Sequence, residues 1–82
     1  MQTECPVILY SRDGCHLCDY VAGMLDEAGV GWRAVDIDRD PRLAERYGLV
    51  IPVVAVAGSG RELAFPFAAD ELARFLEDAN GG

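Results

Sequence analysis

The stretch that decides the fold is VILYSRDGCHLC, at residues 7–18. Its first part is short, rich in β-forming residues and followed by turn residues, so we predict a buried strand over Pro6–Tyr10, with proline tolerated at the first position. The turn at residues 11–14 leads to Cys15-His16-Leu17-Cys18, which opens a stretch of helical periodicity. A dithiol on the first turn of a helix that follows a strand is an arrangement that makes one sulfur nucleophilic. Thiol–disulfide exchange is therefore the leading hypothesis for this motif.

Length and charge narrow the function classes. At 82 residues the chain has room for a single domain, residues 1–82. No apolar run approaches the roughly 18 residues of a membrane span, and the N-terminus lacks the basic flank and apolar core of a secretory signal. The net charge of −7 would repel a nucleic-acid backbone. We therefore expect a cytoplasmic monomer that binds neither nucleic acid nor membrane.

The number of cysteines favours chemistry over structural disulfides. Three is an odd number, and a Cys-x-x-Cys pair in a reducing compartment indicates redox activity or a metal. Zinc needs four ligands, for which the chain offers Cys5, Cys15, His16 and Cys18. Cys5 begins the predicted strand, so about 16 Å separates it from the dithiol and one chain alone cannot close the site. We predict no metal within one chain, and Cys5 is more simply a small buried hydrophobe. Zinc or an iron–sulfur cluster shared between two copies stays open.

Periodicity predicts the remaining elements. A helix runs from Cys15 until Gly29 stops it, and residues Trp32–Asp38 alternate as a second strand. Asp40 and Pro41 open a short helix that ends at Gly48.

The last third of the chain predicts a hairpin and a helix. Residues 50–56 form the most apolar run, and the turn at residues 58–60 pairs it with residues 61–64. The final amphipathic helix starts at Asp70, as its N-cap. The order is βαβαββα, and a right-handed first crossover makes the first two strands parallel. We expect an α/β fold with a four-stranded mixed sheet flanked by three helices.

These motifs together resemble the glutaredoxin-type members of the thioredoxin superfamily. The resemblance rests on Leu9-Tyr10-Ser11 at the end of the first strand, on the Cys15–Cys18 motif at the head of the first helix, and on Val50-Ile51-Pro52 at the start of the third strand. Residues 10–19 are most similar to a bacterial branch of glutaredoxin-like proteins, which implies a role in cell redox homeostasis. In such proteins the proline that matches Pro52 is cis and lies against the dithiol.

The resemblance and the local chemistry assign the catalytic residues. Unpaired N–H groups and the helix dipole are expected to lower the pKa of Cys15, the nucleophile. Arg12 would add positive charge, while Asp13 and Asp19 oppose it. Cys18 would then be the deeper, resolving thiol. His16 either modulates the thiolate when protonated or is an exposed side chain with little influence.

The resemblance also implies a substrate site. Arg12, Ile51 and Asp70 match positions that bind glutathione as co-substrate, Pro52 lies beside them, and Tyr10 either lines the groove or belongs to the core. The paired glycines that normally precede the acid are replaced by residues 67–69, Phe-Ala-Ala, which favours a disulfide-containing protein. We expect no tightly bound cofactor, with glutathione or a reductase supplying electrons. A redox sensor or binding module without turnover is the alternative.

Overall fold

The central sheet brings the N-terminal and C-terminal halves of the chain together. The computed structural model describes residues 7–81, with side chains described as far as Ala79; Cys5 and Pro6 lie outside this range. The predicted order of elements is confirmed, with one short 3-10 helix added. The elements are β1 (Val7–Ser11), α1 (His16–Ala28), β2 (Trp32–Asp36), η1 (Ile37–Arg39), α2 (Pro41–Tyr47), β3 (Val53–Val56), β4 (Arg61–Ala64) and α3 (Ala69–Gly81).

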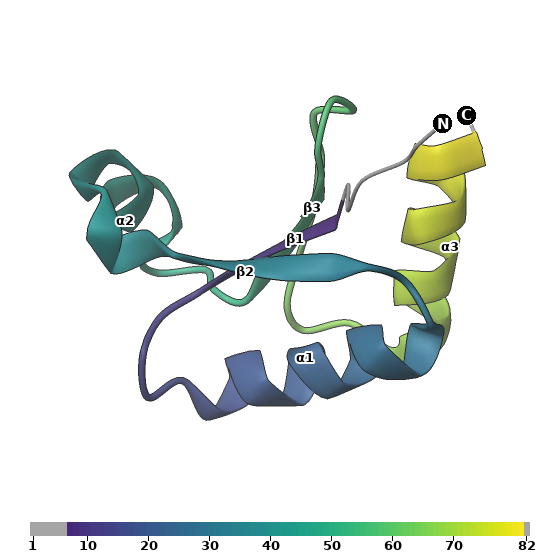
Figure 1. The fold of residues 1–82 in the computed structure, drawn as a ribbon, viewed down its shortest axis with the longest axis horizontal. Helices are drawn as coiled ribbons and strands as arrows, with labels where there is room; N and C mark the ends of the chain where they lie inside the picture. The colour runs from purple at the N-terminus through teal and green to yellow at the C-terminus, as the bar shows by residue number, and fades with distance from the viewer. Residues whose placement is uncertain (1–6, 82) are drawn as a thin grey trace.

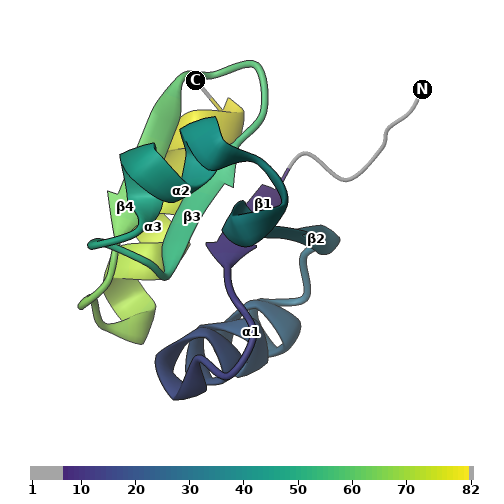
Figure 2. The same cartoon turned by 90° about the vertical axis from the view of Figure 1, so that its left-hand side faces the viewer.

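The sheet is mixed, as predicted, with strand order β2-β1-β3-β4 (Figure 2). β1 and β2 are parallel, and their register ends with Ser11 opposite Asp36. β3 lies antiparallel to β1, with Val53 opposite Tyr10, and β4 pairs antiparallel with β3 as the second half of the predicted hairpin. The carboxyl ends of β1 and β2 therefore lie side by side at one end of the sheet, where the dithiol loop begins.

Helices cover both faces of the sheet (Figures 1 and 2). An apolar cluster holds the helices on each face. Because side chains alternate along a strand, β1 sends Val7 and Leu9 to one face and Tyr10 to the other. The larger cluster packs α1 and α3 against the first face, and it includes Leu9, Val21, Leu25, Val54, Leu72 and Leu76. The smaller cluster packs α2 and η1 against the second face through Ile37, Tyr47 and Val53.

Helix α1 ends where the sequence predicted. Gly29 adopts a left-handed conformation with φ of 77°, and its N–H donates to the carbonyl of Asp26. Glycine accepts this conformation without the steric cost that a Cβ would bring. The chain is thereby turned back toward β2.

The second and third predicted strands are shorter than expected. β2 stops at Asp36 instead of Asp38, because the Asp36 carboxylate accepts the N–H of Asp38 at 2.9 Å and caps η1. β3 begins at Val53 instead of Val50, because the N–H groups of Val50 and Ile51 both donate to the carbonyl of Tyr47. Side-chain and turn hydrogen bonds here replace the ladder that the alternation of residues 32–38 and the apolar run of residues 50–56 predicted.

The start of α3 also differs from the prediction. The helix begins at Ala69, and the carbonyl of Ala68 accepts the N–H of Leu72 at 3.0 Å. The carboxylate of Glu71 reaches back and accepts the N–H of Ala68 at 2.9 Å, as in half of a capping box. Asp70 was the wrong choice of N-cap and lies in the first turn instead. Over residues 7–81, no helix combines the length and the apolar character needed to cross a membrane.

Candidate functional site

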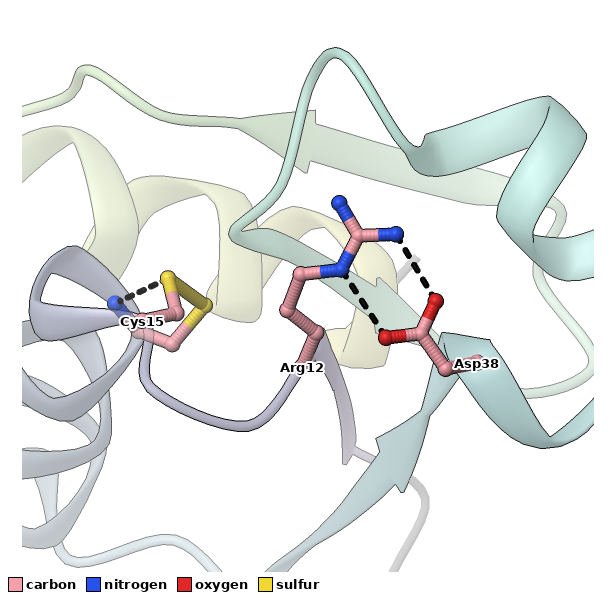
Figure 3. The surroundings of a disulfide bond; sticks show 4 residues. Arg12, Cys15 and Asp38 are labelled. Carbon is pink, nitrogen blue, oxygen red and sulfur yellow. Dashed lines mark hydrogen bonds and ion pairs between the residues drawn. A yellow bond between two sulfur atoms is a disulfide. The ribbon is translucent and has the colours of Figure 1, made fainter.

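The site is built around a disulfide between Cys15 and Cys18 (Figure 3). The two Cα atoms lie 5.2 Å apart, within the range that a disulfide needs. A separation of three residues across the start of a helix brings the two side chains together, because positions i and i+3 share a face. The predicted pairing of the two cysteines on the first turn of α1 is therefore present.

Cys15 is the N-cap of α1. Its backbone is extended (φ −89°, ψ 106°), and its Sγ accepts the N–H of Cys18 at 3.1 Å. The preceding turn sets this position, since Gly14 is left-handed and the N–H of Cys15 donates to the carbonyl of Arg12 at 3.3 Å. The sulfur thus occupies the place that a serine or aspartate oxygen usually takes at a helix start. Negative charge on this atom would face N–H groups and the positive end of the helix dipole.

The two sulfur-bearing residues differ in access to solvent. Cys15 is half-buried, whereas Cys18 is only 4% exposed. A molecule in solution can approach Cys15 but not Cys18. The asymmetry matches what the chemistry needs from an attacking and a resolving thiol.

Arg12 does not extend toward the sulfurs. Its guanidinium donates from Nε and Nη2 to the two carboxylate oxygens of Asp38, at 3.0 and 2.8 Å (Figure 3). The side-chain hydrogen bond and the charge of Asp38 raise the pKa of Arg12, and the same bond lowers the pKa of Asp38. The pair links the dithiol loop to η1. The positive charge that we expected Arg12 to offer to the Cys15 thiolate is therefore paired with the Asp38 carboxylate.

Pro52 lies at the end of the sheet where β1 leads into the dithiol loop. It is fully buried, its bond to Ile51 is cis as the resemblance implied, and it lies one position beyond the paired residues Tyr10 and Val53. Ile51 is half-buried, and its N–H already donates to the carbonyl of Tyr47 at 3.1 Å. A second cis bond joins Phe65 to Pro66, which the sequence did not indicate.

Tyr10 stacks on Tyr47, with ring centroids 4.2 Å apart and an angle of 14° between the planes. Tyr47 is buried, and its hydroxyl donates to the carboxylate of Glu62 on β4. Burial is the main reason that the pKa of Tyr47 is raised well above its ordinary value, and the hydrogen bond to Glu62 adds to it. The contacts place Tyr10 against the smaller core cluster, beside α2.

The other predicted site residues are exposed. His16 is the first residue of α1, and Asp70 pairs with Arg74 at 3.2 Å along α3. A shallow open hollow of about 450 Å³ starts one residue after Cys18, between α1 and the start of α3. Its lining residues are Asp19, Tyr20, Gly23, Met24, Glu27 and Ala69. Over residues 7–81, no three histidine, cysteine or acidic side chains gather as a metal site would require.

Sequence reasoning missed Asp38, which it placed at the end of a strand. Ser11 lies opposite Asp36 in the parallel register, so the residues that follow each strand are neighbours. An arginine after one strand and an acid after the next was the available signal. It becomes readable only once the register is known.

A dithiol at the head of the first helix, beside a β2-β1-β3-β4 sheet, defines the glutaredoxin-like class of thioredoxin folds. Residues 6–77 match the family model described as Glutaredoxin-like domain (DUF836), and the chain belongs to this family. It is 32% identical over 69 residues to Glutaredoxin-C15 of Oryza sativa subsp. japonica; the match spans 74% of this chain and 66% of that protein.

Solved structures share the same fold. The X-ray structure of protein XcR50 from X. campestris superposes with a TM-score of 0.80 at 42% identity, covering 88% of this chain and 96% of that one. The glutaredoxin grx-1 from Archaeoglobus fulgidus superposes with a TM-score of 0.64 at 17% identity, covering 88% and 86%. The second similarity is one of fold alone. Family and geometry together are consistent with a redox role for the Cys15–Cys18 pair.

Proposed function

We propose that this protein is a dithiol–disulfide oxidoreductase in which Cys15 attacks and Cys18 resolves. The observation that supports this most directly is the placement of the Cys15 sulfur, half-exposed at the helix start and within 3.1 Å of a backbone N–H donor. A thiolate is the attacking species, and a hydrogen-bond donor aimed at the sulfur favours that form. His16, exposed beside Cys15, is proposed to add to this stabilisation when it is protonated.

The reaction begins with both thiols reduced. The Cys15 thiolate attacks one sulfur of a substrate disulfide, a mixed disulfide forms, and the first substrate thiolate leaves with the bonding electron pair. Cys18 loses its proton and attacks the Cys15 sulfur. The second substrate thiolate leaves, and the protein holds the disulfide of Figure 3. Two electrons pass from the protein to the substrate, and two thiol groups are released after protonation.

A second reductant must then restore the dithiol. Two equivalents of a monothiol such as glutathione, or one dithiol of a reductase, supply the electron pair and two protons. We propose a protein disulfide or a glutathione mixed disulfide as substrate, with Ile51, Pro52 and Tyr10 at the edge where it would bind. A cytoplasmic setting suits this chemistry, because thiol pools there keep such pairs reduced.

The test is turnover together with trapping of the intermediate. The reduced protein should reduce hydroxyethyl disulfide with glutathione, or insulin with a thioredoxin reductase. Cys15→Ser should lose this activity, and Cys18→Ser should accumulate a mixed disulfide that mass spectrometry detects on Cys15. Glu45→Gln, an exposed change on α2, serves as the control that keeps activity.

The sensor alternative predicts different results. A sensor would change its affinity for a partner with redox state and show no turnover with either electron donor. Equal activity of Cys15→Ser and the unmodified protein would refute the assignment of the nucleophile. Trapping on Cys18 in a Cys15→Ser protein would reverse the two roles.

A further inference from the structure

The charges around the dithiol are mostly negative. Asp13 and Asp19 flank the motif in the chain, and both are exposed. Neither forms an ion pair with another residue within the described range 7–81. Glu27 adds another carboxylate to the hollow that begins at Asp19. A substrate that carries carboxylates next to its disulfide meets this charge when it approaches Cys15.

Arg12 is the arginine closest in sequence to the dithiol, three residues before Cys15. Its planar fork is the geometry that binds a carboxylate through two parallel hydrogen bonds. Asp38 already occupies that fork through both of its oxygens, at 2.8 and 3.0 Å. A substrate carboxylate can use the same two nitrogen atoms only by displacing Asp38.

The pair remains charged across the neutral range. The hydrogen bond between them raises the pKa of Arg12 and lowers the pKa of Asp38, so neither group gives up its charge near neutrality. Asp36 adds a further negative charge near Arg12. The side chains of Arg12 and Asp38 are 37% and 51% exposed, so an incoming anion can reach the pair and compete.

We propose that Asp38 is a specificity-determining residue that withdraws Arg12 from substrate carboxylates, so that the site selects disulfides whose surroundings are neutral or basic. The substrate class is then a disulfide in a neutral or basic segment of a protein, in preference to an anionic one such as glutathione disulfide. This inference rests on the proposed function.

The experiment measures single-turnover rates of the reduced protein with disulfides of different charge. The probes are cystamine, which is cationic, hydroxyethyl disulfide, which is neutral, and dithiodipropionate and glutathione disulfide, which are anionic. The readout is the ratio of the rate with each charged disulfide to the rate with the neutral one. A change in the reactivity of Cys15 itself alters all rates together and leaves the ratios unmoved.

In Asp38→Asn we expect the anionic-to-neutral ratio to rise about two- to fivefold, the range that an exposed ion pair supports. Asp38→Ala, which leaves no oxygen to accept a bond from Arg12, should give at least the same rise. Adding Arg12→Gln to Asp38→Asn should cancel it. Asp13→Asn is the matched control, because it removes the same charge from the dithiol loop without touching the fork of Arg12.

The outcomes separate the two proposals. An unchanged ratio in both Asp38 variants overturns this inference, and so does an equal rise in Asp13→Asn, which would show a general charge effect. A rise that survives the loss of Arg12 also overturns it. Failure to react with any of the disulfides would overturn the proposed function as well.

Discussion

Replacing Cys15 by serine and by alanine separates its structural role from its chemistry. Both variants lack the nucleophile. Serine, however, keeps an oxygen that can accept the Cys18 N–H, whereas alanine leaves that N–H without its partner. Because the Cys15 side chain caps α1, the serine variant should be the more stable of the two.

The size of the difference follows from the cap geometry. Loss of a serine N-cap costs about 1 kcal/mol of protein stability. Unfolding entropy near the midpoint is about 2.1 cal/mol/K per residue, so a chain of 82 residues has about 170 cal/mol/K. Dividing the first quantity by the second gives a difference in Tm of about 6 °C.

The assay is thermal unfolding followed by circular dichroism at neutral pH, with a phosphine reductant that keeps Cys18 as a thiol in both proteins. Glu77→Ser and Glu77→Ala form the control pair, at an exposed position inside α3. Their order should be the reverse, because alanine has the higher helix propensity, by about 0.5 kcal/mol. Equal melting temperatures for the Cys15 pair, or a more stable alanine variant, would refute the capping role.

Further predictions concern stability and its dependence on pH. The pKa of the Tyr47 hydroxyl is raised only in the folded state, so above about pH 10 the unfolded chain loses the hydroxyl proton first. The free energy of unfolding should therefore fall as the pH rises, by up to about 1.4 kcal/mol per pH unit more than in Tyr47→Phe. Urea unfolding between pH 9 and 11 measures this difference. Leu25→Ala empties a fully buried position and should cost about 2–5 kcal/mol in the same assay, whereas a near-neutral result would show that the core collapses to fill it. Gly23→Ala should stabilise the protein by about 0.5–1 kcal/mol, since the new Cβ would meet no atom within 4 Å. Gly29→Ala should destabilise it by about 1 kcal/mol, because the residue has a φ of +77°. Changes of the same sign in thermal unfolding would contradict this pair of predictions.

The order of elements and the position of the dithiol could be read from the sequence because they depend on local patterns. The apolar run before Cys15 and the helical spacing after it are set within a few residues, and Gly29 marks the end of α1 at the predicted place. The cap of α3 was misplaced by two residues, at Asp70 instead of Ala68, the residue before the first helical position. Alanine is not a capping residue, so the bond from its N–H to Glu71 left no signature in the sequence.

The ion pair of Arg12 with Asp38 could not be read in this way. It joins residues 26 positions apart, and it depends on the register between β1 and β2. The stacking of Tyr10 on Tyr47 likewise depends on how α2 lies on the sheet. Local patterns thus fixed the position of the reactive sulfurs, while long-range packing decides which charges and rings surround them.

The two outer strands bear on how this protein behaves when it is concentrated. β2 and β4 span only five and four residues, and each carries an exposed charged side chain, Arg33 on β2 and Arg61 on β4. Short, charged edge strands offer few unpaired backbone N–H and C=O groups to a neighbouring molecule and so disfavour the strand pairing that leads to aggregation. At high protein concentration we therefore expect no pairing of strands between molecules, even though the inner strand β3 is wholly apolar.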